Sequence, residues 1–116
     1  MADRKASAIW QGDLFKGQGT VSATSSGLFT DAGVTWASRT EAPDQTSPEE
    51  LIAAAHAACF CMALSNELSS RGNEPARLAV EAVCTFEGGK ITTMALGVTA
   101  EVPGADGAAL AEALAA

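Results

Sequence analysis

The chain of 116 residues has the length of one domain, and its composition excludes several functional classes. Hydrophobic residues make up 47% and charged residues 18%, which is typical of a folded globular protein and not of a disordered chain. Seven basic against fourteen acidic residues give a net charge of -7, which repels a phosphate backbone, so we expect no nucleic-acid partner. Because no stretch reaches the roughly eighteen apolar residues of a membrane span, and no signal peptide is recognisable, we expect a cytoplasmic protein without membrane contact.

The first third of the chain predicts three short strands. Residues 5–11 and 15–22 suit the first two strands, with Gly12-Asp13 as the turn of a hairpin. Polar and apolar residues alternate over residues 34–41, which predicts a third strand that carries Arg39 near its end. Residues 42–45 then form a loop.

A long helix is predicted over residues 48–71. Ser47 is suited to the N-cap, Pro48 to the first helical position, and Glu50 to the closing position of a capping box. Gly72 stands where a left-handed C-cap ends a helix.

The middle of this helix, residues 51–64, contains no charged residue and is apolar on nearly every face, which predicts burial all round. A domain of this size cannot surround such a helix by itself, so we expect a homodimer in which the partner covers one face. The many alanines of this stretch would let a second backbone approach closely.

The last third predicts a second hairpin and a terminal helix. Two runs with period-two alternation flank Gly88-Gly89, one over residues 78–86, with Cys84 on its apolar face, and one over residues 94–102. Asp106 is suited to cap a last helix, which reaches Ala116 without a C-cap.

Three cysteines are the candidates for chemistry. Their odd number and the absence of a C-x-x-C motif argue against a disulfide framework or a zinc site, and we expect neither a metal nor a cofactor. Cys59 and Cys61 point about 200° apart on a helix, so they cannot pair with each other. Cys61 and Cys84 are interpreted as small hydrophobic residues, whereas Cys59, with His56 three positions earlier, is open to both a structural and a reactive interpretation.

Arg39 and Glu49 are the charged candidates, and each also has a purely structural interpretation. Glu49 is favourable in the first turn of any helix, and Arg39 could be a solvated charge at a strand end. A guanidinium near a thiol would favour the reactive thiolate, and a carboxylate would orient that guanidinium. Glu49 and Cys59 are separated by about 15 Å along one helix, so a shared pocket would need Glu49 from the partner chain, with the two helices antiparallel.

Several motifs resemble the OsmC subgroup of the OsmC/Ohr family, from about residue 5 to the end of the chain. They are W-Q-G-D at residues 10–13, G-Q-G-T-V at 17–21, S-P-E-E-L-I at 47–52 and A-A-H-A-A-C-F at 54–60. The run that joins the last two motifs is long and distinctive.

The resemblance implies an α+β fold in which antiparallel sheets wrap around a long buried central helix in an intertwined homodimer. It also implies a thiol-dependent peroxidase that reduces organic hydroperoxides, and hydrogen peroxide less well, with a dithiol as reductant. By motif position the peroxidatic cysteine is Cys59, and Arg39 and Glu49 complete the catalytic site. An apolar entrance lined by Phe60, Met62 and Trp36 would suit bulky alkyl peroxides.

The chain departs from the family pattern at one point. The family's second, resolving cysteine lies in a G-C-P-V-S-like motif, which is absent, and neither Cys61 nor Cys84 is a persuasive substitute. We expect a single OsmC-like domain over residues 1–116 that lacks the family's C-terminal segment, since the terminal helix is unfinished. The alternative functions are a non-catalytic small-molecule binder and a one-cysteine redox sensor, and a purely structural dimer module ranks last.

Overall fold

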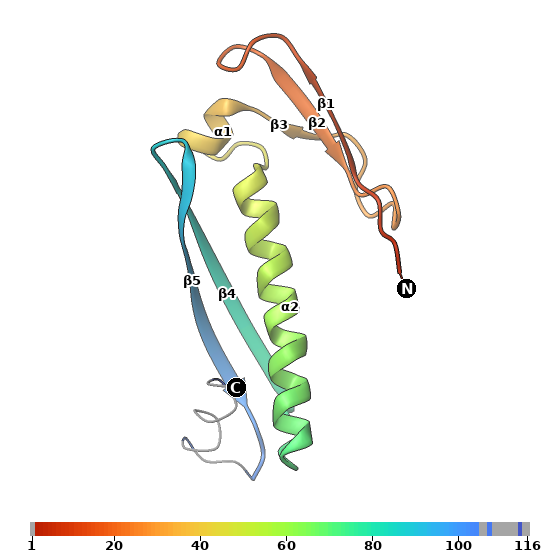
Figure 1. The fold of residues 1–116 in the computed structure, drawn as a ribbon, viewed down its shortest axis with the longest axis vertical. Coiled ribbons are helices and arrows are strands. Elements are labelled where there is room, and N and C mark those ends of the chain that lie inside the picture. Colours follow the sequence, from red (N-terminus) through yellow and green to blue (C-terminus); the bar gives the residue numbers. More distant parts are fainter. Residues whose placement is uncertain (1, 105–106, 108–113, 115–116) are drawn as a thin grey trace. The chain divides into compact units, whose positions relative to one another are not determined.

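A computed structural model describes residues 2–104, 107 and 114. Its elements, drawn in Figure 1, fall into two compact units. The first unit contains the described residues up to Leu51 together with Gly88–Lys90, and the second contains Ile52–Glu87 and the described residues from Ile91 onward. The predicted α+β class with antiparallel strands is confirmed.

The first unit contains a three-stranded antiparallel sheet. Strand β1 (Ser7–Gln11) pairs with β2 (Gln18–Ser22), and β2 pairs with β3 (Ala32–Val34). The predicted hairpin is therefore present, but its loop is longer than expected. The Asp13 carboxylate accepts a hydrogen bond from the Lys16 backbone N–H at 2.8 Å, and the Asp13 carbonyl accepts one from Gly17 at 3.0 Å. This Asx-type turn delays the second strand to Gln18.

The third strand, predicted over residues 34–41, is wrong except at its first residue, because β3 ends at Val34 and the chain then forms the short helix α1 (Trp36–Thr40). Thr35 has an extended backbone, and its hydroxyl accepts a hydrogen bond from the Ser38 backbone N–H at 3.1 Å. This N-cap satisfies one of the backbone donors that the first turn of a helix leaves without an intrahelical partner. Arg39 therefore lies in the last turn of a helix and not at the end of a strand.

Helix α2 (Pro48–Ser70) begins where the sequence predicts it. The Ser47 hydroxyl accepts a hydrogen bond from the Glu50 backbone N–H at 3.2 Å, as an N-cap does. In a full capping box the Glu50 carboxylate would accept a hydrogen bond from the Ser47 backbone N–H. Here it accepts one from the Thr46 hydroxyl at 2.7 Å instead.

The same helix ends at Ser70, one residue before the predicted end. Gly72 has a φ of +79°, and its N–H donates to the Ser69 carbonyl at 3.0 Å while that of Asn73 donates to the Leu68 carbonyl at 2.8 Å. These two bonds form a Schellman motif, which confirms Gly72 as the residue that ends the helix.

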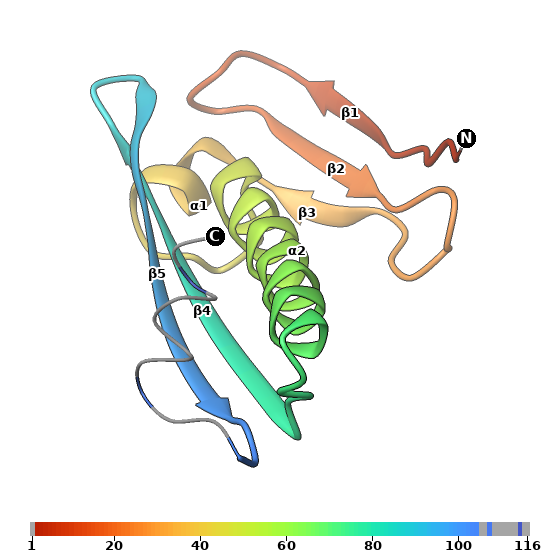
Figure 2. The ribbon, with the colours of Figure 1, turned by 60° about the horizontal axis from the view of Figure 1, so that its bottom comes forward.

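The second unit is the greater part of α2 packed against the hairpin of β4 (Arg77–Glu87) and β5 (Lys90–Glu101), which run beside it in Figures 1 and 2. Exposed and half-buried residues alternate over residues 80–87 of β4 and 93–101 of β5, as the period-two pattern predicts, and Cys84 is half-buried. Leu64 and Leu68 are the buried centre, and the residues packed against them are Phe60, Leu78, Val98 and Val102.

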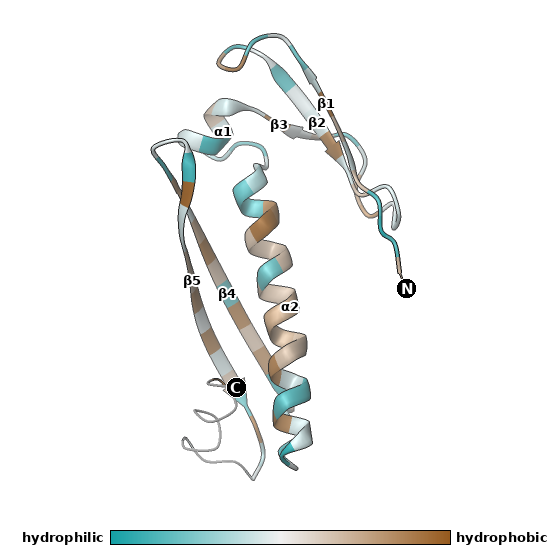
Figure 3. Ribbon diagram, in the orientation of Figure 1, coloured by the Kyte–Doolittle hydropathy of each residue, from teal (hydrophilic) through white to brown (hydrophobic). Residues whose placement is uncertain are grey.

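Most of the apolar face of α2 is not covered within one chain. Figure 3 shows pale brown to brown residues along its middle, yet only 11% of its most apolar 18-residue window is buried, and Met62 is 71% exposed. A single chain therefore does not bury the helix all round, as expected for a domain of this size, because one two-stranded hairpin covers one side only. Burial of the rest by a partner stays a prediction. By length and composition alone the helix could cross a membrane, a test that core helices of soluble proteins also pass. The predicted helix after Asp106 lies outside the described residues.

Candidate functional site

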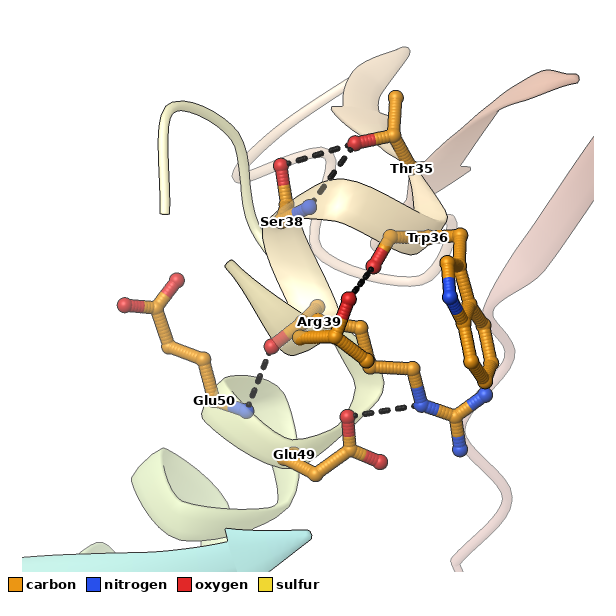
Figure 4. A network of polar contacts seen from close by, with 8 residues as sticks. Thr35, Trp36, Ser38, Arg39, Glu49 and Glu50 are labelled. Atoms are coloured by element: carbon orange, nitrogen blue, oxygen red, sulfur yellow. Dashed lines mark hydrogen bonds and ion pairs between the residues drawn. The ribbon is translucent and has the colours of Figure 1, made fainter. Parts of the chain in front are cut away.

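The first two candidate residues, Arg39 and Glu49, form an ion pair. Arg39 Nε donates a hydrogen bond to Glu49 Oε1 at 2.9 Å, which joins the last turn of α1 to the first turn of α2 (Figure 4). The carboxylate is well buried, with 8% of its side chain exposed, whereas the Arg39 side chain is 29% exposed. A buried carboxylate is costly without a partner, and here it has both the guanidinium and the favourable N-terminal end of a helix.

An aromatic side chain also positions the guanidinium. Arg39 Cζ lies 5.6 Å from the centroid of the Trp36 ring, a cation–π distance, and Trp36 comes from the first turn of the same short helix. The Phe15 ring meets Trp36 edge-on, with centroids 5.5 Å apart and an interplanar angle of 87°. Arg39 is therefore held from two directions and stays partly accessible.

A cavity of about 240 Å³ opens beside this arrangement. Arg39 is the one charged residue among those that line it, and the others are mostly apolar: Trp10, Leu14, Val34, Thr35, Trp36 and Pro48. Such a cavity suits an apolar group that carries one polar or anionic end next to the guanidinium. Among the predicted entrance residues, Trp36 lines the cavity, whereas Phe60 packs against the core of the second unit.

Sequence reasoning missed Trp10 and Leu14 as cavity residues. Trp10 belongs to the W-Q-G-D motif, which carried part of the family resemblance. The motif did not indicate that the Trp10 side chain lines a cavity. The Trp10 indole N–H donates to the carbonyls of Gly12 and Asp13, both at 3.1 Å, so the ring is fixed against the loop that carries Leu14.

Cys59 lies in the middle of α2 with an exposed side chain. Like Cys61 and Cys84, which are half-buried, it forms no disulfide. Cys61 lines a groove with Arg77 and other residues of the second unit. Among the described residues, no group of three or more histidine, cysteine or acidic side chains could hold a metal ion.

Glu49 and Cys59 are ten positions apart on the unbroken helix α2, which corresponds to about 15 Å along its axis. The structure thus brings Arg39 and Glu49 together, and it places the exposed thiol about three turns further along the helix. The ion pair can bind and orient a polar group, and the thiol can act as a nucleophile.

Comparison with known proteins identifies the family. A family model described as OsmC-like protein matches residues 41–116. The chain is 42% identical over 107 residues to Peroxiredoxin OsmC of Escherichia coli (strain K12) and to that of Shigella flexneri, with 89% of this chain and 74% of each relative covered.

A solved structure supports the same fold. It is that of an organic hydroperoxide resistance protein from Elizabethkingia anophelis, with a TM-score of 0.55 and 21% identity, and the match covers 94% of this chain and 80% of that one. The resemblance noted in the sequence motifs is therefore confirmed. The chain belongs to the OsmC-like family.

Proposed function

We propose that this protein is a thiol-dependent peroxidase that reduces organic hydroperoxides to alcohols, and hydrogen peroxide less well. The observation that carries the proposal is the ion pair between the buried Glu49 and the partly accessible Arg39, which lines an apolar cavity. The 42% identity to proteins named Peroxiredoxin OsmC supports the same chemistry. The cavity suits an alkyl or aryl group better than it suits the small and polar hydrogen peroxide.

The reaction begins at Cys59. Its thiolate attacks the distal oxygen of the hydroperoxide, the O–O bond breaks, and the products are a cysteine sulfenic acid and an alkoxide that takes up a proton to become the alcohol. Arg39 stabilises the thiolate and the charge that develops on the peroxide, and Glu49 holds the guanidinium in place. A dithiol reductant then returns the sulfenic acid to the thiol, with release of water and formation of a disulfide in the reductant.

We propose that the site is completed by two copies of the chain. Since Glu49 and Cys59 are about 15 Å apart along α2, Arg39 and Glu49 of one copy would serve Cys59 of the other, with the two α2 helices antiparallel.

The exposed face of α2 supports this homodimer. The uncharged run between Glu50 and Glu67 covers residues 51–66, about 24 Å of helix, which is shorter than the roughly 30 Å hydrocarbon core of a bilayer. Its alanines favour close approach of another backbone. The hairpin of β4 and β5 is a two-stranded sheet, which is marginally stable unless further strands or helices cover it.

We propose a soluble, cytoplasmic dimer in which residues 1–116 act as one domain, since α2 runs without a break from the first unit into the second. The alternatives, a non-catalytic binder and a one-cysteine sensor, are not favoured by relatives that are named as peroxiredoxins. The number of peroxide molecules consumed per chain distinguishes these alternatives from an enzyme, because a sensor consumes about one and an enzyme consumes many.

The first prediction concerns the nucleophile. Replacing Cys59→Ser abolishes peroxide consumption in the presence of excess dithiol, because serine cannot form the sulfenic acid. Replacing Cys61→Ser leaves multiple turnovers per chain. Consumption of tert-butyl hydroperoxide is the assay, and a Cys59→Ser protein as active as wild type would refute the proposed role.

The second prediction concerns the ion pair. Arg39→Gln lowers kcat/KM for the same hydroperoxide by about 100-fold, because a charge-stabilising donor is lost. Glu49→Gln lowers it by about tenfold, because the guanidinium loses its charged partner. The matched control is Arg71→Gln, which breaks the exposed Arg71–Glu67 pair of 2.9 Å and leaves kcat/KM unchanged. Equal effects of Arg39→Gln and Arg71→Gln would contradict a catalytic role for the first pair.

The third prediction concerns the exposed helix. Sedimentation equilibrium gives twice the chain mass of 11.7 kDa for the wild type, and Ala58→Glu shifts it to the monomer, because a charge would be buried in the interface. Leu28→Glu, at a residue 82% exposed in the first unit, keeps the dimer. A monomeric wild type, or a wild type that sediments with lipid vesicles, would contradict the proposal.

A further inference from the structure

We propose that His56 is the general acid of this site and protonates the alkoxide that leaves when the hydroperoxide O–O bond breaks. The inference rests on the proposed peroxidase function, with Cys59 as nucleophile, and adds a catalytic residue to it.

The first support is placement. His56 and Cys59 both lie in the uninterrupted helix α2, three positions apart, and both side chains are exposed. Residues at this spacing are neighbours on the helix surface, with Cβ atoms about 5–6 Å apart. Because helical side chains lean towards the N-terminus, the Cys59 thiol lies over the turn that carries His56. A peroxide whose distal oxygen meets the thiol can therefore place its second oxygen near the imidazole.

The second support is the lack of another proton donor on this part of the helix. Residues 51–66 contain no Asp, Glu, Lys or Arg, and His56 is the one histidine of the chain. Cys61 lies about 200° around the helix from Cys59. Arg39 does not give up its proton, so it can stabilise charge but cannot protonate a leaving group.

The third support is chemical need. An alkoxide is a strongly basic leaving group, and its departure is slow unless a proton arrives with it. In the proposed step, the thiolate sulfur forms a bond to the distal oxygen, and the O–O electrons go to the alkoxide oxygen. That oxygen takes the imidazolium proton. Solvent then returns a proton to the imidazole, and the products are the sulfenic acid and the alcohol.

The test compares two oxidants whose leaving groups differ. When the O–O bond of tert-butyl hydroperoxide breaks, the leaving group is an alkoxide, which needs a proton. When the O–O bond of peroxyacetic acid breaks, the leaving group is a carboxylate, which does not. We expect His56→Gln to lower the second-order rate constant of Cys59 oxidation about 100-fold with the alkyl hydroperoxide and to change it little with the peroxyacid. Asn66→Gln is the matched control, since it introduces the same side chain two helical turns after Cys59, at an exposed residue, and should change neither rate.

A second variant covers the case in which His56→Gln folds poorly. In His56→Ala, added imidazole should restore the rate with tert-butyl hydroperoxide in proportion to its concentration. The inference is overturned if His56→Gln keeps the wild-type rate with both oxidants, if it loses both rates equally, or if imidazole restores nothing. A wild-type Cys59 that reacts with neither oxidant would instead overturn the proposed peroxidase function itself, a distinct result seen before any His56 variant is compared.

Discussion

The candidate site depends on the burial of one carboxylate. Glu49 is 6% exposed at the first turn of α2, so its negative charge needs a cation within hydrogen-bond distance. Arg39 supplies that cation, and the ion pair ties α1 to α2. The position of Trp36, and with it one wall of the apolar cavity, follows from the same short helix. A charge-stabilising group, its positioning partner and a place for an apolar substrate thus arise from one local arrangement.

A second constraint is the length of α2. A straight helix keeps its residues at fixed intervals, so the ion pair at its start and the thiol near its middle stay about 15 Å apart in one copy of the chain. The apolar middle of the helix is also largely exposed in that copy. Both facts are accounted for by a second copy laid antiparallel along the first. The proposed dimer would bury the helix and, by the same contact, complete the site.

Local signals predicted much of the fold. The Ser47-Pro48 start and the Gly72 end of α2 were predicted from the sequence, because caps act through hydrogen bonds between residues close in the chain. The alternation of exposed and half-buried residues in β4 and β5 was also predicted, because one face of each strand packs against the helix. The strand predicted over residues 34–41 failed because the Thr35 cap, formed by a single side chain, outweighed a short period-two pattern.

The site itself was only partly predictable. Cys59, Arg39 and Glu49 were selected by resemblance to a family pattern, and the ion pair between the last two follows from the geometry of α1, which the sequence pattern did not predict. Trp10 and Leu14 were missed as cavity residues, because they reach the cavity through contacts between segments far apart in the chain. Neither the periodicity of apolar residues nor a capping motif indicates such contacts.

The central claim, that each site is built from two copies, is tested most directly by complementation. Cys59→Ser and Arg39→Gln chains are co-expressed with different affinity tags, and the mixed dimers are isolated and assayed with tert-butyl hydroperoxide. The mixed dimer contains one site with both Cys59 and Arg39 intact, so we expect about half of the wild-type activity, although each parent dimer is impaired. Mixed dimers no more active than the average of the two parents would show that Arg39 and Cys59 act within a single chain, and would contradict the account.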